Sequence, residues 1–355
     1  MTRLANLGAA PALVVGLLSL AACGGGSALP ASSTSGANGI ESIAQRAQNA
    51  HEKSPCTKSA CIYVGNEASS VTVYPATSSG NVPPVQAISG SQTGLEDVWA
   101  VAVDASRNIY SANYRGNYGV GDLTVYAAGS TGNVAPTATI SGRSSVDPLL
   151  LPSGIGVDST GNIYATGQSS ISISVYAPGT NGTPTPIQYI QGYHTGLSDP
   201  DCLAVTPNGT MYVTNPGNAS VTVYAAGANG NVAPIQTIAG TKTGIFTPNC
   251  VAVDSKGTIY VSSSKPGYPT GCCVTVYDKD ANGNVRPIRS IKGSKTQISY
   301  AGGIAVDSSG EVYVSNFNTN SLTVYAKHAH GNVAPIRVIS GTMTGLDQPA
   351  DLTIH

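Results

Sequence analysis

The sequence predicts an all-β fold, a closed six-bladed β-propeller of four-stranded antiparallel blades, and three observations lead to it. Four short apolar signatures each occur six times along the 355 residues, and the one that ends in Tyr recurs in steps of 48 to 53 residues. Each signature is rich in Val, Ile, Thr and Tyr and is bounded by Gly, Pro, Asn and Ser, as strands are. No window of the repeats sustains a helical apolar period. Four strands in each repeat of about 50 residues are typical of propeller blades.

The inner strand of each blade is expected at a run similar to Val-Ala-Val-Asp. Its second position is always a small residue in the full copies, which suits the crowded axis of a propeller. The runs are Val101–Asp104, Ile155–Asp158, Leu203–Thr206, Val251–Asp254 and Ile304–Asp307, with a degenerate copy at Leu352–His355.

The other three strands of each blade follow in a fixed order. The second strands begin at Ile62, Ile109, Ile163, Met211, Ile259 and Val312. The third strands end at Tyr74, Tyr126, Tyr176, Tyr224, Tyr277 and Tyr325. The outer strands are expected at Val85–Ile88, Thr137–Ile140, Ile187–Ile190, Ile235–Ile238, Ile288–Ile291 and Ile336–Ile339.

The order of the signatures indicates how the ring closes. The repeats begin with a second strand at Ile62 and end with an inner strand at Leu352–Ile354. The first blade therefore takes its inner strand from the C-terminus. An open solenoid of stacked repeats is the alternative, but it does not explain this offset.

The N-terminus has the features of a secretory signal peptide. Arg3 is followed by an apolar run that ends in Leu-Ala-Ala before Cys23, and this run is too short to span a membrane. The motif resembles the bacterial lipobox, which implies cleavage before Cys23 and acylation of that residue. An ordinary signal peptide beside a free Cys is the alternative. We expect a signal peptide at 1–22, a lipidated linker with a short helix at 23–55, and the propeller at 56–355.

This arrangement predicts an extracytoplasmic protein of the cell envelope, held on a membrane by lipid. Gly24, rather than Asp, follows the lipidated Cys, which by analogy with lipoproteins favours the outer membrane where the organism has one. Only 10% of residues are charged and the net charge is −1, so no basic patch exists for nucleic acid. We expect a monomer.

Six cysteines remain once Cys23 is set aside, an even number that suits disulfides in an oxidising compartment. We favour three pairs, Cys56–Cys61 around a short loop, Cys202–Cys250 between equivalent positions of adjacent repeats, and Cys272–Cys273. The alternative for the last pair is a bond from one of its members to Cys250. A metal–thiolate cluster is disfavoured, because paired C-x₂-C spacing is missing.

The combined motifs resemble the NHL-type six-bladed propellers. The elements that carry the resemblance are IYV followed by Ala or Ser and Asn, VTVY, and AVD-S-x-G, and they cover about Cys56 to His355. The resemblance implies the propeller fold. It does not select an activity, because such rings serve as binding scaffolds, lactonases and lyases.

Polar residues gather on the face where loops enter the inner strands and leave the second strands. Side chains ahead of the inner strands form a column: Trp99, Ser153, Asp201, Asn249, Gly302 and Ala350, with Asp351 one step on. Asn and Asp around a channel suit a polyol or a hard cation, and the alternative is that they cap turns. The candidate ligand-binding residues are Trp99, Asn113, Asp201, Asn215, Asn249, Asn316 and Asp351.

We favour a non-catalytic module that binds a protein, a glycan or a small molecule, with no cofactor and no catalytic residue assigned. The alternative is a metal-dependent, lactonase-like hydrolase or lyase with one divalent cation in the channel. That enzyme would use Asp201, Asn249 and Asp351, and His194 is the one loop side chain placed to act as a base.

Overall fold

The computed structural model describes residues 56, 59–115, 121–142, 149–265 and 272–355. The signal peptide, Cys23, the linker and the short helix predicted within residues 1–55 lie outside the described residues. Within the part that is described, no helix has the length and apolar character needed to cross a membrane.

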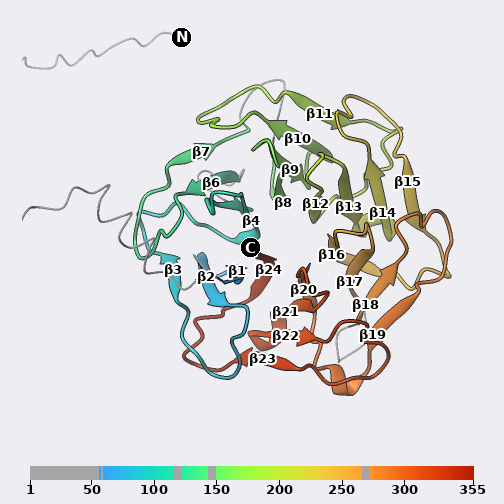
Figure 1. The fold of residues 1–355 in the computed structure, drawn as a ribbon. Helices are drawn as coiled ribbons and strands as arrows, with labels where there is room; N and C mark the ends of the chain where they lie inside the picture. The colour runs from blue at the N-terminus through green and yellow to red at the C-terminus, as the bar shows by residue number, and fades with distance from the viewer. Residues whose placement is uncertain (1–55, 57–58, 116–120, 143–148, 266–271) are drawn as a thin grey trace, which may run out of the picture. The chain divides into compact units, whose positions relative to one another are not determined.

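Six four-stranded antiparallel sheets form the blades of a propeller, as the repeats predict (Figure 1). The inner strands surround the axis, and their small residues line a central cavity, as expected from the crowding there. These strands are β24 (Pro349–Ile354), β4 (Val98–Val103), β8 (Pro152–Val157), β12 (Leu203–Val205), β16 (Thr247–Val253) and β20 (Ala301–Val306).

Outside the inner strands, each blade repeats the predicted order of three further strands. The second strands are β1 (Cys61–Asn66), β5 (Ile109–Asn113), β9 (Ile163–Gly167), β13 (Met211–Asn215), β17 (Ile259–Ser264) and β21 (Val312–Asn316). The third strands are β2 (Ser70–Pro75), β6 (Asp122–Tyr126), β10 (Ser172–Tyr176), β14 (Ser220–Tyr224), β18 (Cys273–Tyr277) and β22 (Ser321–Tyr325). The outer strands are β3 (Gln86–Ser89), β7 (Ala138–Ile140), β11 (Gln188–Gln191), β15 (Gln236–Ala239), β19 (Arg289–Lys292) and β23 (Arg337–Ser340).

The ring closes through β24, which pairs with β1 in the first blade. Ile62 faces Ile354, Val64 faces Leu352, and Gly65 faces Asp351 in this ladder. The C-terminal strand therefore completes the N-terminal blade, which confirms the closure predicted from the offset of the signatures.

The Tyr residues that end the third strands tie each blade to the loop arriving from the blade before it. Tyr277 is fully buried, and its hydroxyl donates to the Thr243 carbonyl oxygen at 2.6 Å. Tyr126, Tyr224 and Tyr325 donate to equivalent Thr carbonyls at 2.6 to 2.7 Å. These rings therefore pack the core rather than form a ligand platform.

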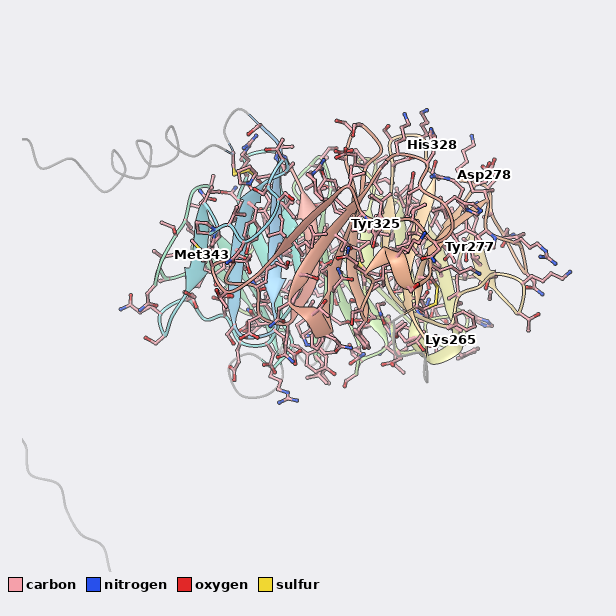
Figure 2. The ribbon with its side chains drawn as sticks, turned by 90° about the horizontal axis from the view of Figure 1, so that it is seen from below. Lys265, Tyr277, Asp278, Tyr325, His328 and Met343 are labelled. Atoms are coloured by element: carbon pink, nitrogen blue, oxygen red, sulfur yellow. A yellow bond between two sulfur atoms is a disulfide. The ribbon has the colours of Figure 1, made fainter. Side chains whose placement is uncertain are left out.

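The two faces of the ring differ in what they carry. Seen from the side, Asp278 and His328 lie on one face and Lys265 lies on the other (Figure 2). Lys265 follows β17, so its face is the one where the second strands end. Short 3₁₀ turns occur in loops of the described residues, among them η2 (Pro216–Asn218), η3 (Ser294–Thr296) and η4 (Phe317–Thr319).

The three favoured cysteine pairs are present as disulfides: Cys56–Cys61, Cys202–Cys250 and Cys272–Cys273. Because Cys250 pairs with Cys202, the alternative bond from Cys250 to the neighbouring pair does not form. Cys202 lies just before β12 and Cys250 lies in β16, so this disulfide joins the inner strands of adjacent blades.

Candidate functional site

A cavity of about 110 Å³ lies at one end of the channel, on the face where loops enter the inner strands. We call it the mouth cavity. All six residues of the predicted column line it, together with Asp351, so the structure brings these positions together at one end of the channel. The full lining is Glu67, Trp99, Ser153, Asp201, Cys202, Asn249, Cys250, Tyr300, Gly302, Phe317, Ala350 and Asp351.

β-Bulges position most of the column. In the β4–β5 ladder Val98 faces Asn113 and Ala100 faces Ala112, so Trp99 has no partner residue. Bulges at equivalent places leave Ser153, Asn249, Gly302 and Ala350 without ladder partners. A bulge bends its strand and re-aims the extra side chain. The repeated bulge therefore turns these residues toward the axis, where they meet.

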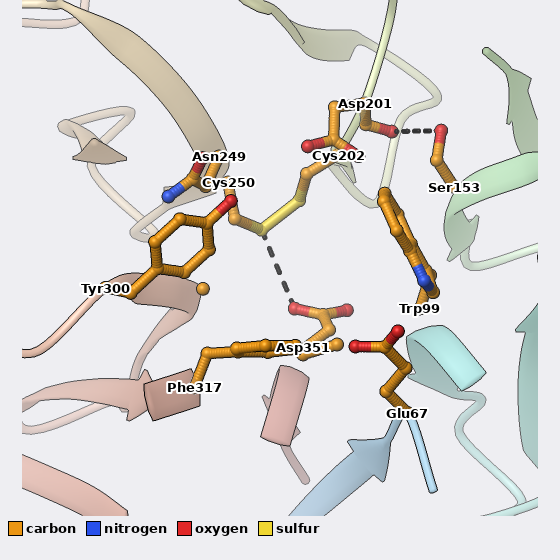
Figure 3. A pocket seen from close by; sticks show the side chains of 12 residues that line it. Glu67, Trp99, Ser153, Asp201, Cys202, Asn249, Cys250, Tyr300, Phe317 and Asp351 are labelled. Atoms are coloured by element: carbon orange, nitrogen blue, oxygen red, sulfur yellow. Dashed lines mark hydrogen bonds between the residues drawn. A yellow bond between two sulfur atoms is a disulfide. The ribbon is translucent and has the colours of Figure 1, made fainter. Parts of the chain in front are cut away.

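Aromatic side chains form much of the wall. Trp99 stacks on Tyr114 with ring centroids 4.1 Å apart, which fixes the indole plane. Across the cavity, Tyr300 lies at 5.6 Å from Phe317 in a tilted arrangement (Figure 3). Tyr300 has φ 52°, a left-handed conformation that is costly for a bulky residue. The equivalent residue is also left-handed in four other repeats, so this repeated loop conformation places the exposed Tyr300 ring at the rim.

The ionisable side chains on the lining are Glu67, Asp201, Asp351 and Tyr300, and no Lys, Arg or His is among them in the described chain. Burial raises the pKa of Asp201 well above its usual range, and the nearby Asp199 and Asp351 carboxylates raise it further. Burial also raises the pKa of Asp351 to about 7, although hydrogen bonds from the Val101 and Leu352 amides oppose this. The pKa of Glu67 is raised by burial and by Asp97. The lining is therefore acidic, and simultaneous ionisation of all three carboxyl groups is disfavoured.

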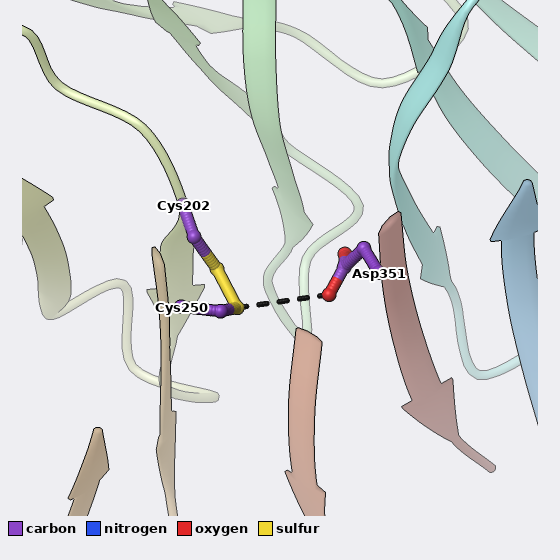
Figure 4. A group of neighbouring side chains, drawn as sticks. All are labelled: Cys202, Cys250 and Asp351. Carbon is purple, nitrogen blue, oxygen red and sulfur yellow. Dashed lines mark hydrogen bonds between the residues drawn. A yellow bond between two sulfur atoms is a disulfide. The ribbon is translucent and has the colours of Figure 1, made fainter. Parts of the chain in front are cut away.

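Asp351 and the Cys202–Cys250 disulfide form the floor of the mouth cavity. The same three residues also line a second cavity of about 250 Å³, the channel cavity, which the inner strands enclose. Asp351 Oδ1 lies 3.6 Å from Cys250 Sγ, while Oδ2 accepts a hydrogen bond from the Val101 amide at 3.2 Å (Figure 4). Gly303 leaves room for this carboxyl group, because a Cβ there would lie 2.5 Å from Oδ1.

The carboxyl groups do not converge as a metal site would require. In the described chain, one group of three Cys, His, Asp or Glu side chains has its ligand atoms within 4.8 Å, namely Cys202, Cys250 and Asp351. Two of these atoms are disulfide sulfurs, which carry no negative charge for a cation. The side-chain Nδ2 of Asn249 donates a hydrogen bond to the Ala301 carbonyl oxygen at 2.5 Å.

Three predicted ligand-binding residues, Asn113, Asn215 and Asn316, do not line the mouth cavity. All three are fully buried at the ends of second strands. Their Oδ1 atoms accept hydrogen bonds from the amides of Glu96, Ser198 and Ser299, and their Nδ2 atoms donate to Thr hydroxyls. They hold the loops that lead to the inner strands, which is the turn-capping role weighed as the alternative. His194 does not line the cavity either.

Sequence reasoning missed Tyr300, Phe317 and the disulfide as parts of the wall. Tyr300 lies two residues before the column position Gly302, and Phe317 directly follows β21. Both offsets could have been followed in the other repeats, where the residues are mixed: Leu151 is apolar at the first offset and Tyr114 is aromatic at the second. Glu67 lies directly after β1 and is also on the lining.

Known proteins resemble this chain in structure but not in sequence. No known family's sequence profile matches it, and no curated protein matches it by sequence. A protein of unknown function from Bacteroides caccae superposes with a TM-score of 0.56 at 11% identity, covering 83% of this chain and 98% of its own. A protein provisionally described as a 6-phosphogluconolactonase, from Bacteroides fragilis, gives 0.54 at 14% identity, covering 85% and 99%. A chain of a nidogen/laminin complex gives 0.53 at 14% identity, covering 83% and 98%. These likenesses concern the propeller fold alone.

Proposed function

We propose that the protein is a non-catalytic binding module whose mouth cavity takes a small organic cation, such as an alkylammonium group. The observation that carries this proposal is the lining. It combines three aromatic rings with three carboxyl groups. Among the described residues, no Lys, Arg or His belongs to it. Rings present a negative face to a cation, and each well-placed contact contributes about 0.5–2 kcal/mol.

The raised carboxyl pKa values fit such a ligand. Burial raises the pKa of Asp201 well above its usual range and the pKa of Asp351 to about 7, so burial favours the protonated form of both carboxyl groups. A bound cation favours their ionised forms, so binding should release protons to the solvent. Glu67, which lies closer to the rim, supplies attraction before the ligand is bound.

The alternative function is a metal-dependent hydrolase or lyase of the lactonase type. Its proposed ligands Asp201, Asn249 and Asp351 all line the cavity, but the one described group of three Cys, His, Asp or Glu side chains with ligand atoms within 4.8 Å includes only Asp351 of these. The cation-binding proposal invokes no cofactor. Binding that persists unchanged in a chelator supports it, and binding that appears only with a divalent cation supports the enzyme.

Trp99 offers a direct test, because it is the single Trp of the chain and lines the cavity. We would excite the indole and titrate with tetramethylammonium, and in parallel with glycerol and glucose as neutral polyols. A saturable change with the cation and none with the polyols is the expected result. Saturation by a polyol without a response to the cation would replace this proposal with a polyol site.

We further propose that the module is exported and anchored to a membrane by lipid on Cys23. The support is the signal-peptide pattern and the Leu-Ala-Ala-Cys motif. Labelled fatty acid should enter the wild-type protein and not the Cys23→Ser variant in the native host. Equal labelling of both would refute the anchor while leaving the binding proposal untouched.

A further inference from the structure

The floor of the mouth cavity has the parts of a redox site, independently of the ligand proposed above. Its disulfide joins Cys202 and Cys250, and the Asp351 carboxyl oxygen lies 3.6 Å from Cys250 Sγ. The sulfur of a disulfide has no proton to donate. A hydrogen bond at this contact therefore requires a protonated Asp351 carboxyl group as the donor. With Asp351 ionised, the contact joins a carboxylate anion to an uncharged sulfur.

The disulfide can be approached from the mouth cavity, because both of its residues form part of that lining (Figure 3). The titratable groups that share this side with Asp351 are Asp201, Glu67 and Tyr300. On the other side, the channel cavity is lined by the inner strands, and Asp351 is its one charged lining residue in the described chain. No Lys, Arg or His lines either cavity among the described residues, so the groups that can exchange a proton with Asp351 there are the two carboxyl groups and Tyr300.

The Cys56–Cys61 disulfide provides a contrast within the same molecule. Cys56 and Cys61 are 3% and 0% exposed and pack in an apolar cluster with residues such as Val71 and Val73. Cys202 and Cys250 are themselves nearly buried, at 8% and 4%, but their remaining exposure opens onto a cavity with an acid in contact. The two disulfides therefore differ in the chemistry around the sulfur.

We propose that the Cys202–Cys250 disulfide exchanges with small thiols that enter the mouth cavity, and that Asp351 gives its proton to Cys250 as the bond breaks. A thiolate of the reductant attacks Cys202 Sγ and forms a mixed disulfide. The S–S electron pair passes to Cys250 Sγ, which takes the carboxyl proton. Protonation of the leaving sulfur drives the step forward.

A second thiolate completes the exchange. It attacks the reductant's sulfur in the mixed disulfide and releases the Cys202 thiolate, which takes a proton from water. The protein disulfide has then gained two electrons and two protons, and a dithiol reductant has become a disulfide. Asp351 regains its proton from the solvent. Reduction also removes the covalent link in the floor between the mouth and channel cavities.

The test follows both disulfides in one sample. The full folded protein is treated with dithiothreitol, quenched by alkylation at set times, and digested for mass spectrometry of each cysteine pair. We expect Cys202–Cys250 to be reduced at least about tenfold faster than Cys56–Cys61 at pH 7. In the Asp351→Asn variant this ratio should fall by about tenfold, because the amide has no acidic proton to give. Asp280→Asn, an exposed carboxyl on a turn, is the matched control and should keep the wild-type ratio.

A second measurement keeps the proposal testable should Asp351→Asn fold poorly. The ratio of the two rates in the wild type cancels the ionisation of the reductant, which both disulfides share. It should fall as pH rises through about 7, where Asp351 loses its proton. A ratio that is flat with pH, a Cys202–Cys250 rate no faster than that of Cys56–Cys61, or an unchanged ratio in a folded Asp351→Asn variant would overturn the proposal.

Discussion

The main-chain amide of Cys61 donates to the carbonyl oxygen of His355 at 2.8 Å, and the His355 amide returns a bond to Cys61 at 3.1 Å. This pair is the outermost contact of the β1–β24 ladder, and it ties the first described strand to the last residue. In a closed ring every blade packs against a neighbour on both faces. The β1–β24 ladder keeps the ring closed and so keeps both faces of each sheet buried. The fold thus depends on the pairing of β24 with β1.

Removal of residues 351–355 should therefore destabilise the whole domain. The truncation removes most of β24 and exposes one face of the first blade and one of the last. We expect the free energy of unfolding to fall by at least about 4 kcal/mol, in the range of severe lesions. Thermal unfolding followed by circular dichroism measures it. An unchanged midpoint would mean that the closure contributes nothing.

Each buried Tyr hydroxyl between blades should contribute a measurable part of the stability. Tyr277→Phe keeps the ring but leaves the Thr243 carbonyl oxygen without its donor. We expect a loss of about 1–2 kcal/mol in the free energy of unfolding, measured by denaturant titration. Tyr193→Phe is the control, because Tyr193 is 88% exposed and should change stability little. Equal effects in the two variants would contradict the role assigned to the buried hydroxyl.

Asp351 should make the fold less stable as pH rises. Its pKa is near its normal value in the unfolded chain and is raised to about 7 in the folded state. Below about pH 4 both states are protonated and no cost arises. Between about pH 4 and 7 the unfolded state gives up the proton more readily, so stability falls, and above pH 7 the loss is constant.

Asp351→Asn should remove this cost while keeping an acceptor for the Val101 amide. The variant should be more stable than the wild type at pH 8 by a few kcal/mol, about 4 at most, with the difference vanishing near pH 4. Denaturant unfolding across this range measures it. The prediction is wrong if the stability of the variant minus that of the wild type decreases between pH 4 and pH 8.

Glu67 should strengthen cation binding through its charge rather than its shape. Glu67→Gln keeps the size of the side chain. We expect the dissociation constant for tetramethylammonium to rise about fivefold to tenfold, a loss of binding free energy close to 1 kcal/mol. Added salt should weaken binding to the wild type more than to the variant. Asp280→Asn, far from the lining and exposed, is the control. A variant that binds as tightly as the wild type would remove Glu67 from the site.

Much of this architecture could be predicted because the same strand signatures recur in the same order in every repeat. The Tyr and Val-Ala-Val-Asp signatures give the strand order, and their offset gives the closure. Asn249 and Asn215 mark the limit. Both are Asn residues within a strand near the same face, yet Asn249 lines the cavity and Asn215 is fully buried. The difference arises from the bulge at Asn249, a backbone feature that residue type alone does not reveal.

The aromatic wall was hidden for a similar reason. Tyr300 is the one aromatic residue at its offset, and Phe317 shares its offset with Tyr114 alone, so the periodic signal for this wall is weak. Tyr300 shares its left-handed backbone with the equivalent residues Asp97, Leu151, Asp199 and Gln348, so the loop conformation repeats while the aromatic side chain does not. The acid–disulfide contact joins Asp351 of the first blade to Cys250 of the fifth, and only the closed ring brings these positions together.

The most direct test of the proposed cation site compares choline with its neutral isostere 3,3-dimethylbutan-1-ol, which has the same shape without the charge. Isothermal titration calorimetry at pH 7 should give a dissociation constant at least about tenfold lower for choline. Repeated in two buffers that differ in ionisation enthalpy, it should also show proton release from the acidic lining. Equal affinity for the two ligands, or binding of neither, would contradict the account.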